Sequence, residues 1–149
     1  MKQTLKLSLA VTVLLAGGAY AHAARAEAPE AGRWVTENGN LEVEIAACGE
    51  SYCGIVTQVL ANNAMTGPGG EKMPMDPNAP SPVGKKILFD LQPMASGGWQ
   101  GRIYNRASNK TYHSQLVAQG QGRLQVRIYE DDPTKGMIQV WRRCGLAAQ

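Results

Sequence analysis

The residues best able to do chemistry in this chain are its three cysteines, Cys48, Cys53 and Cys144. Four residues separate Cys48 from Cys53, in a stretch that we expect to form the tip of a β-hairpin. A redox-active pair is usually Cys-x-x-Cys at the N-terminus of a helix, and neither condition is met here. In an oxidising compartment the pair is expected to form a structural disulfide, which leaves Cys144 as a free thiol or as a handle for another molecule.

Metal binding and acid–base catalysis have few candidate residues. His113 is the single histidine beyond residue 26, and a zinc or nickel site normally needs more ligands. Met73 and Met75 could bind Cu(I), but few methionines and no histidine accompany them. The acidic run Glu130-Asp131-Asp132 lacks the spacing of a calcium loop. We therefore predict no metal, no cofactor and no catalytic site, so the protein is not expected to be an enzyme.

The N-terminal residues indicate the cellular compartment in which the protein functions. A start with two lysines and no acid precedes an apolar run over residues 7–16, and overlapping small-x-small patterns follow. This order is typical of a secretory signal peptide, here residues 1–26 with Ala26 as its last residue, or alternatively Ala21 or Ala23. A membrane-spanning helix would need roughly 20 apolar residues, about twice the run found. The mature chain is thus expected to be periplasmic or secreted, without a membrane span.

The charge of the predicted mature domain, residues 27–149, argues against two classes of partner. The whole chain has 15 Lys and Arg against 12 Asp and Glu, and Lys2, Lys6 and Arg25 lie in the predicted signal peptide. The mature domain is therefore formally neutral. Nucleic-acid binding needs a basic stripe, and an anionic membrane surface attracts clustered Lys and Arg. Neither feature is present in the sequence, so we expect neither partner.

The mature chain is a series of short β-forming segments between Gly-rich turns. Asn38-Gly39 is the clearest hairpin signal, because both central positions of such a turn need positive φ. Evenly spaced strands without a helix predict one all-β domain, a small antiparallel barrel or sandwich of roughly eight strands. The predicted strands are residues 34–37, 40–45, 54–60, 86–91, 99–104, 111–118, 123–129 and 137–143.

Residues 61–84 interrupt this rhythm with five prolines and no apolar periodicity. We predict a long loop there, and a loop of that length in a compact domain is usually functional or disordered. Elsewhere the predicted inward faces are bulky and uncharged, apart from Thr57 and Ser114. Such faces fill a small barrel completely or leave a narrow apolar pocket. The best-defined faces are Leu41/Val43/Ile45, Ile87/Phe89/Leu91, Leu124/Val126/Ile128 and Ile138/Val140.

Several short motifs occur in order along nearly all of the mature chain. They are Gly32-Arg33-Trp34, Glu44-Ile45, Cys48, Cys53-Gly54, Val83-Gly84, Ile87-Leu88, Gly98-Trp99-x-Gly101-x-Ile103-Tyr104, Lys110-Thr111-Tyr112 and Trp141-x-Arg143. As a set they resemble a family of small exported bacterial proteins known as a domain of unknown function. The resemblance implies a compact β-domain outside the cytoplasm and brings no assigned activity. The chain departs from the family pattern in the loop at 61–84 and in Cys144.

Gly32-x-Trp34 lies near the start of the predicted mature chain and Arg143 near its end. This arrangement resembles that of lipocalin-like barrels, which begin with Gly-x-Trp and end with an Arg whose guanidinium covers that Trp across the closed base. The resemblance implies a lipocalin-like barrel with Trp34 and Arg143 as a structural plug, stabilised by a cation–π contact. The alternative is that Trp34 is an ordinary core residue.

These observations predict an exported, non-catalytic barrel that binds a small apolar or amphipathic ligand. We name three aromatic residues, Phe89, Trp99 and Tyr112, as the candidate ligand contacts. The alternative is a cell-envelope interaction or structural protein with a solid core, which meets an envelope protein through its long loop or its strand edges.

Overall fold

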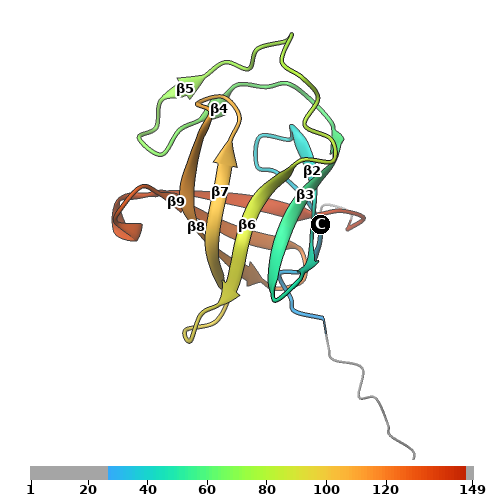
Figure 1. Cartoon of the computed structure of the whole chain (residues 1–149), viewed down its shortest axis with the longest axis vertical. Helices are drawn as coiled ribbons and strands as arrows, with labels where there is room; N and C mark the ends of the chain where they lie inside the picture. Colours follow the sequence, from blue (N-terminus) through green and yellow to red (C-terminus); the bar gives the residue numbers. More distant parts are fainter. Residues whose placement is uncertain (1–26, 147–149) are drawn as a thin grey trace, which may run out of the picture.

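The computed structural model describes residues 27–146, and the predicted signal peptide at 1–26 lies outside the described residues. Eight strands form a closed antiparallel barrel in the order β1-β10-β9-β8-β7-β6-β3-β2, and β4 pairs separately with β5 (Figure 1). The elements are β1 (Gly32–Val35), β2 (Leu41–Cys48), β3 (Ser51–Val59), β4 (Met65–Thr66), β5 (Lys72–Met73), β6 (Lys86–Pro93), β7 (Trp99–Asn105), β8 (Lys110–Gln119), β9 (Arg123–Tyr129), the 3-10 turn η1 (Pro133–Lys135) and β10 (Met137–Arg143).

The prediction of a single all-β domain with an eight-stranded antiparallel barrel is confirmed. Each barrel strand pairs with its neighbour in the chain, except where β3 pairs with β6 across the long loop and β1 pairs with β10 to close the sheet. Closure pairs every strand on both sides, so the described barrel has no free strand edge. No helix within residues 27–146 is long and apolar enough to cross a membrane.

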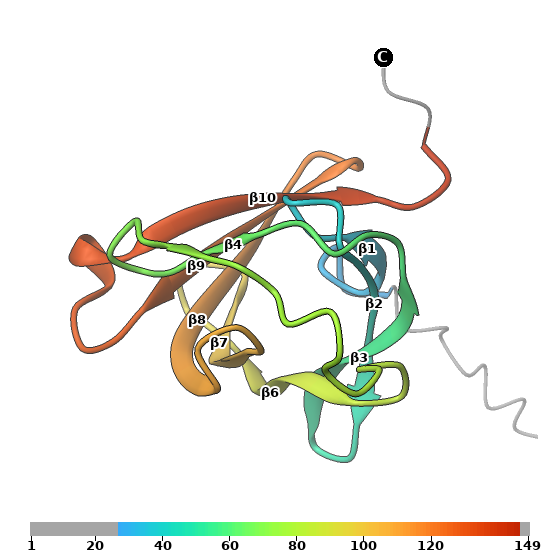
Figure 2. The same ribbon diagram turned by 90° about the horizontal axis from the view of Figure 1, so that it is seen from above.

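The alternating strand directions divide the connections between two ends of the barrel, which we call the base and the mouth. The base is formed by residues 28–31 and the turns at 49–50, 94–98 and 120–122. The mouth is formed by the turn at 36–40, the long loop at 60–85 and the turns at 106–109 and 130–136. Seen from above, the part of the long loop that carries β4 runs across the mouth (Figure 2).

The predicted inward faces of β2 and β9 lie in the core, since Leu41, Val43 and Ile45 and their counterparts on β9 are all buried. The face predicted for β6 was wrong at Phe89, which is only half-buried. Asp90 has a φ of 51°, and the pairing of β6 with β7 shifts register there. This irregularity resets the alternation, so that Leu88 is buried in place of Phe89, whereas Ile87 and Leu91 are buried as predicted.

The prediction for β10 was also wrong, because its alternation runs in the opposite phase. Ile138 is 45% exposed, whereas Trp141 is 1% exposed and belongs to the core. Since successive side chains of a strand point to opposite faces, Gln139 shares the inward face with Trp141. The inward face of β10 therefore brings a polar side chain toward the mouth, where the sequence predicted only apolar ones.

Candidate functional site

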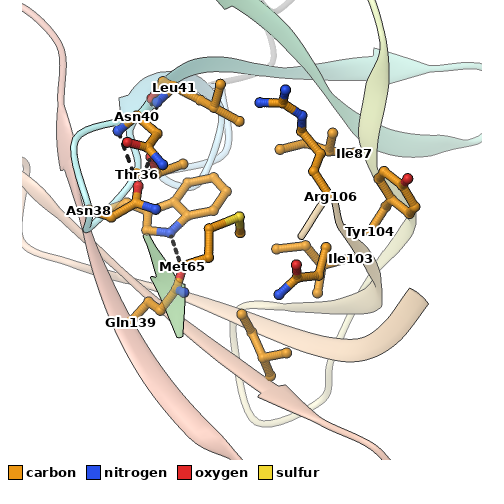
Figure 3. Close-up of a pocket in the computed structure, with 13 residues that line it drawn as sticks. Thr36, Asn38, Asn40, Leu41, Met65, Ile87, Ile103, Tyr104, Arg106 and Gln139 are labelled. Atoms are coloured by element: carbon orange, nitrogen blue, oxygen red, sulfur yellow. Dashed lines mark hydrogen bonds between the residues drawn. The ribbon is translucent and has the colours of Figure 1, made fainter. Parts of the chain in front are cut away.

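A small pocket lies in the mouth of the barrel and has a volume of about 40 Å³. Isoleucines from β6, β7 and β9 and Trp141 contribute apolar lining. Met65 from the long loop lies in the middle of the ring of lining residues (Figure 3). We call the polar side chains of the lining, with Tyr104, its rim. The lining residues are Thr36, Asn38, Asn40, Leu41, Met65, Ile87, Ile103, Tyr104, Asn105, Arg106, Ile128, Gln139 and Trp141.

A larger groove adjoins this pocket, between the second half of the long loop and β6, and has a volume of about 540 Å³. The groove and the pocket share Ile87, Tyr104 and Arg106, so the two hollows meet at these residues. We call them the mouth pocket and the outer groove. The outer groove is lined by Pro74, Met75, Asp76, Ala79, Pro80, Ser81, Pro82, Lys85, Lys86, Ile87, Phe89, Tyr104, Arg106 and Ala107.

Asn40 holds the first part of the long loop over the mouth. Its side chain is almost fully buried and makes two hydrogen bonds to the backbone of Asn63, donating from Nδ2 to the carbonyl oxygen at 2.8 Å and accepting from the amide at 2.7 Å. Asn63 Nδ2 in turn donates to the carbonyl oxygen of Asn38. These bonds fix the backbone two residues before Met65, and this places the thioether over the mouth pocket.

Trp34 and Arg143 lie against each other at the base. The Arg143 guanidinium carbon lies 4.1 Å from the centroid of the Trp34 ring, and Trp34 is fully buried. The indole Nε1 donates to the carbonyl oxygen of Glu30 at 3.0 Å. The guanidinium also donates to three backbone carbonyl oxygens, those of Pro29, Ala31 and Gln121.

Gly32 makes this close approach of Arg143 possible. Its φ is +112°, and a Cβ built on it would lie 2.5 Å from Arg143 Nη1. Any other residue would be strained by its backbone angle and would collide with the guanidinium. The geometry gives a physical reason for glycine two residues before Trp34.

Comparison with known protein families identifies the family of this chain. A family described as "Uncharacterized protein conserved in bacteria (DUF2147)" matches residues 32–143. The chain belongs to this family. The match begins at Gly32 and ends at Arg143, the two residues that meet beneath Trp34 at the base.

A solved structure shows the same fold at low sequence identity. It is described as "Protein HP1028 from the human pathogen Helicobacter pylori belongs to the lipocalin family", and it superposes with a TM-score of 0.59 at 18% identity. The alignment covers 78% of this chain and 83% of the other. The fold of this DUF2147 protein is therefore lipocalin-like. None of the curated proteins matches the chain.

The three aromatic residues predicted as ligand contacts are not brought together. Phe89 lines the outer groove. Trp99 is buried at the start of β7, beside the base, with its ring centroid 4.1 Å from that of Tyr52. Tyr112 is buried on β8, and its hydroxyl lies 3.2 Å from Ser108 Oγ. Neither Trp99 nor Tyr112 lines the mouth pocket or the outer groove.

Cys48 and Cys53 form a disulfide across the hairpin of β2 and β3, with their Cα atoms 5.7 Å apart. Cys144 is free and half-buried, and its Sγ donates to Glu42 Oε2 at 3.3 Å. Burial, and then the hydrogen bond and the negative charge of Glu42, raise the pKa of the Cys144 thiol. The pKa of Glu42 is lowered, first by the hydrogen bond from the Thr57 hydroxyl, against an opposing effect of burial.

His113 lies on the outer face of β8, where it is exposed and stacks on Tyr129 at 5.4 Å between ring centroids. Ser114, one residue further, points into the core, and its Oγ is buried without a hydrogen-bond partner among residues 27–146. Thr57 bonds to Glu42 on the outside of the barrel. No group of three or more His, Cys, Asp or Glu in the described part of the chain could hold a metal ion.

Sequence reasoning missed the polar residues around the mouth pocket, above all Arg106, Asn105 and Gln139. One signal was available for Gln139, because the bulky Trp141 lies two residues further along the same strand face. Had Trp141 fixed the inward phase of β10, Gln139 would have been expected inside the barrel. Arg106 lies in a turn, where no periodicity indicates the direction of a side chain.

Proposed function

We propose that this protein is an exported, non-catalytic barrel that binds a small apolar or amphipathic ligand at its mouth. The observation that carries the proposal is the pair of adjoining hollows that meet at Ile87, Tyr104 and Arg106. The outer groove, at about 540 Å³, falls within the roughly 300–1,000 Å³ usual for small-molecule sites. The lipocalin-like fold supports the same proposal.

The mouth pocket is too small to hold such a ligand without a change. At about 40 Å³ it has room for little more than one water molecule. Met65 is the residue best able to yield, because an unbranched thioether has three rotatable bonds and adapts to irregular spaces. We propose that the apolar part of the ligand lies in the outer groove against Phe89 and enters the barrel where Met65 moves aside.

The place of action is outside the cytoplasm. The Cys48–Cys53 disulfide supports this proposal, since such bonds persist in oxidising compartments, and so does the predicted signal peptide. The predicted mature domain is formally neutral, and nucleic-acid binding needs a basic surface. Its charge therefore favours a partner other than nucleic acid.

Binding of Nile red, a neutral apolar dye, tests the proposal. We expect its fluorescence to rise on addition of the purified protein and to saturate. Phe89→Ala removes an aromatic wall of the outer groove and should weaken binding about three- to tenfold, a loss of about 1 kcal/mol. Val117→Ala is the matched control, because Val117 is an exposed apolar residue of β8 that lines neither hollow. Equal weakening by both variants, or no saturable binding, would contradict a site in the groove.

A second function, contact with an envelope protein through the long loop, is favoured by the exposed apolar residues at the two ends of that loop. Leu60 is 44% exposed and Val83 is 50% exposed. The other version of this alternative, pairing through strand edges, has no support in the closed barrel. Mass spectrometry of the protein isolated under native conditions separates the two functions, since a retained small molecule supports the first and a co-purified envelope protein the second.

A further inference from the structure

We propose that the ligand of the mouth is an amphipathic carboxylate, with Arg106 as the partner of its head group. This inference rests on the proposed function and narrows it, because it concerns the polar end of the ligand. Three observations carry it: a half-buried arginine with no hydrogen-bond partner among residues 27–146, side-chain amides whose unbonded groups are donors, and the charges along the outer groove.

Arg106 lies in the turn between β7 and β8, where the mouth pocket and the outer groove meet. Its side chain reaches across the opening toward Leu41 (Figure 3). The other half-buried arginines of residues 27–146 are satisfied, Arg127 by the carbonyl oxygen of Pro133 and Arg143 at the base. Arg106 alone among them makes no hydrogen bond or ion pair within the described part of the chain. A cation in a partly apolar hollow therefore has its donors free for a ligand.

Three side-chain amides on the rim of the mouth pocket have their oxygens occupied. Asn38 Oδ1 accepts from the amide of Asn40 at 3.1 Å, and Gln139 Oε1 accepts from the indole Nε1 of Trp141 at 2.9 Å. Asn105 Oδ1 accepts from two backbone amides of its own turn, those of Ala107 and Ser108.

These bonds fix the orientation of each side-chain amide, because a backbone N–H or an indole N–H can donate but cannot accept. The free group of Asn38, Asn105 and Gln139 is consequently the NH₂ in each case. Asn40 uses both ends of its amide on Asn63. Tyr104 donates its hydroxyl proton to Asn109 Oδ1, so only its oxygen, an acceptor, remains for a ligand.

The free groups of these three side-chain amides and of Arg106 are therefore donors, and a ligand that satisfies them must supply acceptors. An ionised carboxylate accepts only, and its two oxygens match the planar fork of a guanidinium. The outer groove has the same preference, since Lys85, Lys86 and Arg106 line it against the single acidic side chain of Asp76. A trimethylammonium head group accepts no hydrogen bond, and the positive charges of Lys85, Lys86 and Arg106 would repel it.

Three amphipaths with the same tail test the inference by isothermal titration calorimetry: decanoate, decanol and decyltrimethylammonium. We expect decanoate to bind the purified protein about tenfold or more tightly than decanol, and the cation to bind most weakly. Arg106→Gln should remove about tenfold of the decanoate affinity and leave that of decanol unchanged. Arg123→Gln is the matched control, because it removes the same charge from an exposed arginine at the base end of β9 and should change neither affinity.

Equal binding of decanoate and decanol to the unaltered protein would overturn the inference while leaving the proposed function standing. That comparison needs no variant, so it holds even if Arg106→Gln destabilises the fold. A preference for decanoate that survives in Arg106→Gln would overturn the role of Arg106. If none of the three compounds binds, the proposed function fails together with the inference.

Discussion

The guanidinium of Arg143 lies on the face of the Trp34 indole, 4.1 Å from its ring centroid, and joins the last barrel strand to the first. Three backbone carbonyl oxygens from the N-terminal segment and the β8–β9 turn accept its hydrogen bonds. The same side chain therefore covers the ring and binds backbone carbonyl groups at the base. We propose that this contact is the structural plug of the barrel.

The plug predicts energetic coupling between the two residues. Trp34→Ala should lower the free energy of unfolding by about 3–5 kcal/mol, because a large buried ring leaves a cavity. Arg143→Ala should lower it by about 1–2 kcal/mol through lost stacking and lost aliphatic packing. In a double-mutant cycle measured by urea unfolding, we expect a coupling energy of about 1 kcal/mol. Strict additivity would show that Trp34 is an ordinary core residue.

The alternation of β2 over residues 41–45 and of β9 was predictable because bulky apolar side chains alternate there with charged or polar ones. The errors fell where that contrast is weak. On β6, Asp90 adopts a positive φ and the pairing with β7 shifts register, and the apolar pattern of the sequence does not indicate either irregularity. On β10, apolar side chains occupy both faces, so Ile138 and Val140 suggested the wrong phase. The number and spacing of the short strands and the residues of their turns thus predicted the barrel. Local irregularities of the strands determine which side chains point into it.

The candidate site was less predictable than the fold, because it depends on contacts between distant segments. The bond from Asn40 to Asn63 joins a hairpin turn to the long loop, and the sequence gives only the turn chemistry of the Asn-Gly pair. Trp99 and Tyr112, chosen as aromatic residues on predicted strands, instead pack in the core. Both are buried, but neither lines the mouth pocket or the outer groove.

Removal of the Asn40 side chain should release the first part of the long loop. Asn40→Ala abolishes both hydrogen bonds to the Asn63 backbone, and each contributes about 0.5–1.5 kcal/mol. We expect hydrogen exchange of the Asn63 amide to quicken about tenfold, with little change in the amides of β9. Asn78→Ala, which alters an exposed side chain of the same loop, should leave that rate unchanged. Unaltered exchange in Asn40→Ala would show that other contacts hold the loop.

Thiol alkylation of the folded protein without reductant should label Cys144 alone. Cys48 and Cys53 are joined in a disulfide, so labelling of either would contradict that bond. The raised pKa of the Cys144 thiol lowers the fraction of reactive thiolate at neutral pH, so alkylation should be slow there. The alkylation rate should continue to rise with pH beyond the pKa of an ordinary thiol.

The charge of Glu42 contributes to this raised pKa of Cys144 and can be tested separately. Glu42→Gln should shift the pH profile of Cys144 alkylation to lower pH, because the carboxylate that opposes thiolate formation is gone. Glu44→Gln removes the same charge from the next outward position of β2 and should leave the profile unchanged. A profile that stays in place in Glu42→Gln would mean that burial alone sets the pKa of the thiol.

The lowered pKa of Glu42 also predicts a dependence of stability on acid. A carboxyl group whose pKa is lower in the folded state adds stability that is present above the unfolded-state pKa and is lost as the pH falls through the folded-state value. Thr57→Val removes the first cause of that shift, the hydroxyl hydrogen bond to Oε1 at 2.8 Å. Urea unfolding at neutral and acidic pH should show a smaller acid loss in Thr57→Val than in the unaltered protein, and an equal loss would contradict this assignment.

Gly32→Ala should destabilise the barrel for two separable reasons. The φ of +112° strains any residue with a Cβ, and the new methyl group would lie 2.5 Å from Arg143 Nη1. Gly39→Ala is the matched control, since Gly39 also has positive φ, at +74°, but a Cβ there would meet no atom within 4 Å. We expect Gly39→Ala to cost about 1 kcal/mol and Gly32→Ala about 2–4 kcal/mol in thermal or urea unfolding. Combining Gly32→Ala with Arg143→Ala should then cost less than the sum of the two single changes, because the collision needs both groups. Full additivity would mean that Arg143 moves away without loss, and it would remove the requirement for glycine at this position on steric grounds.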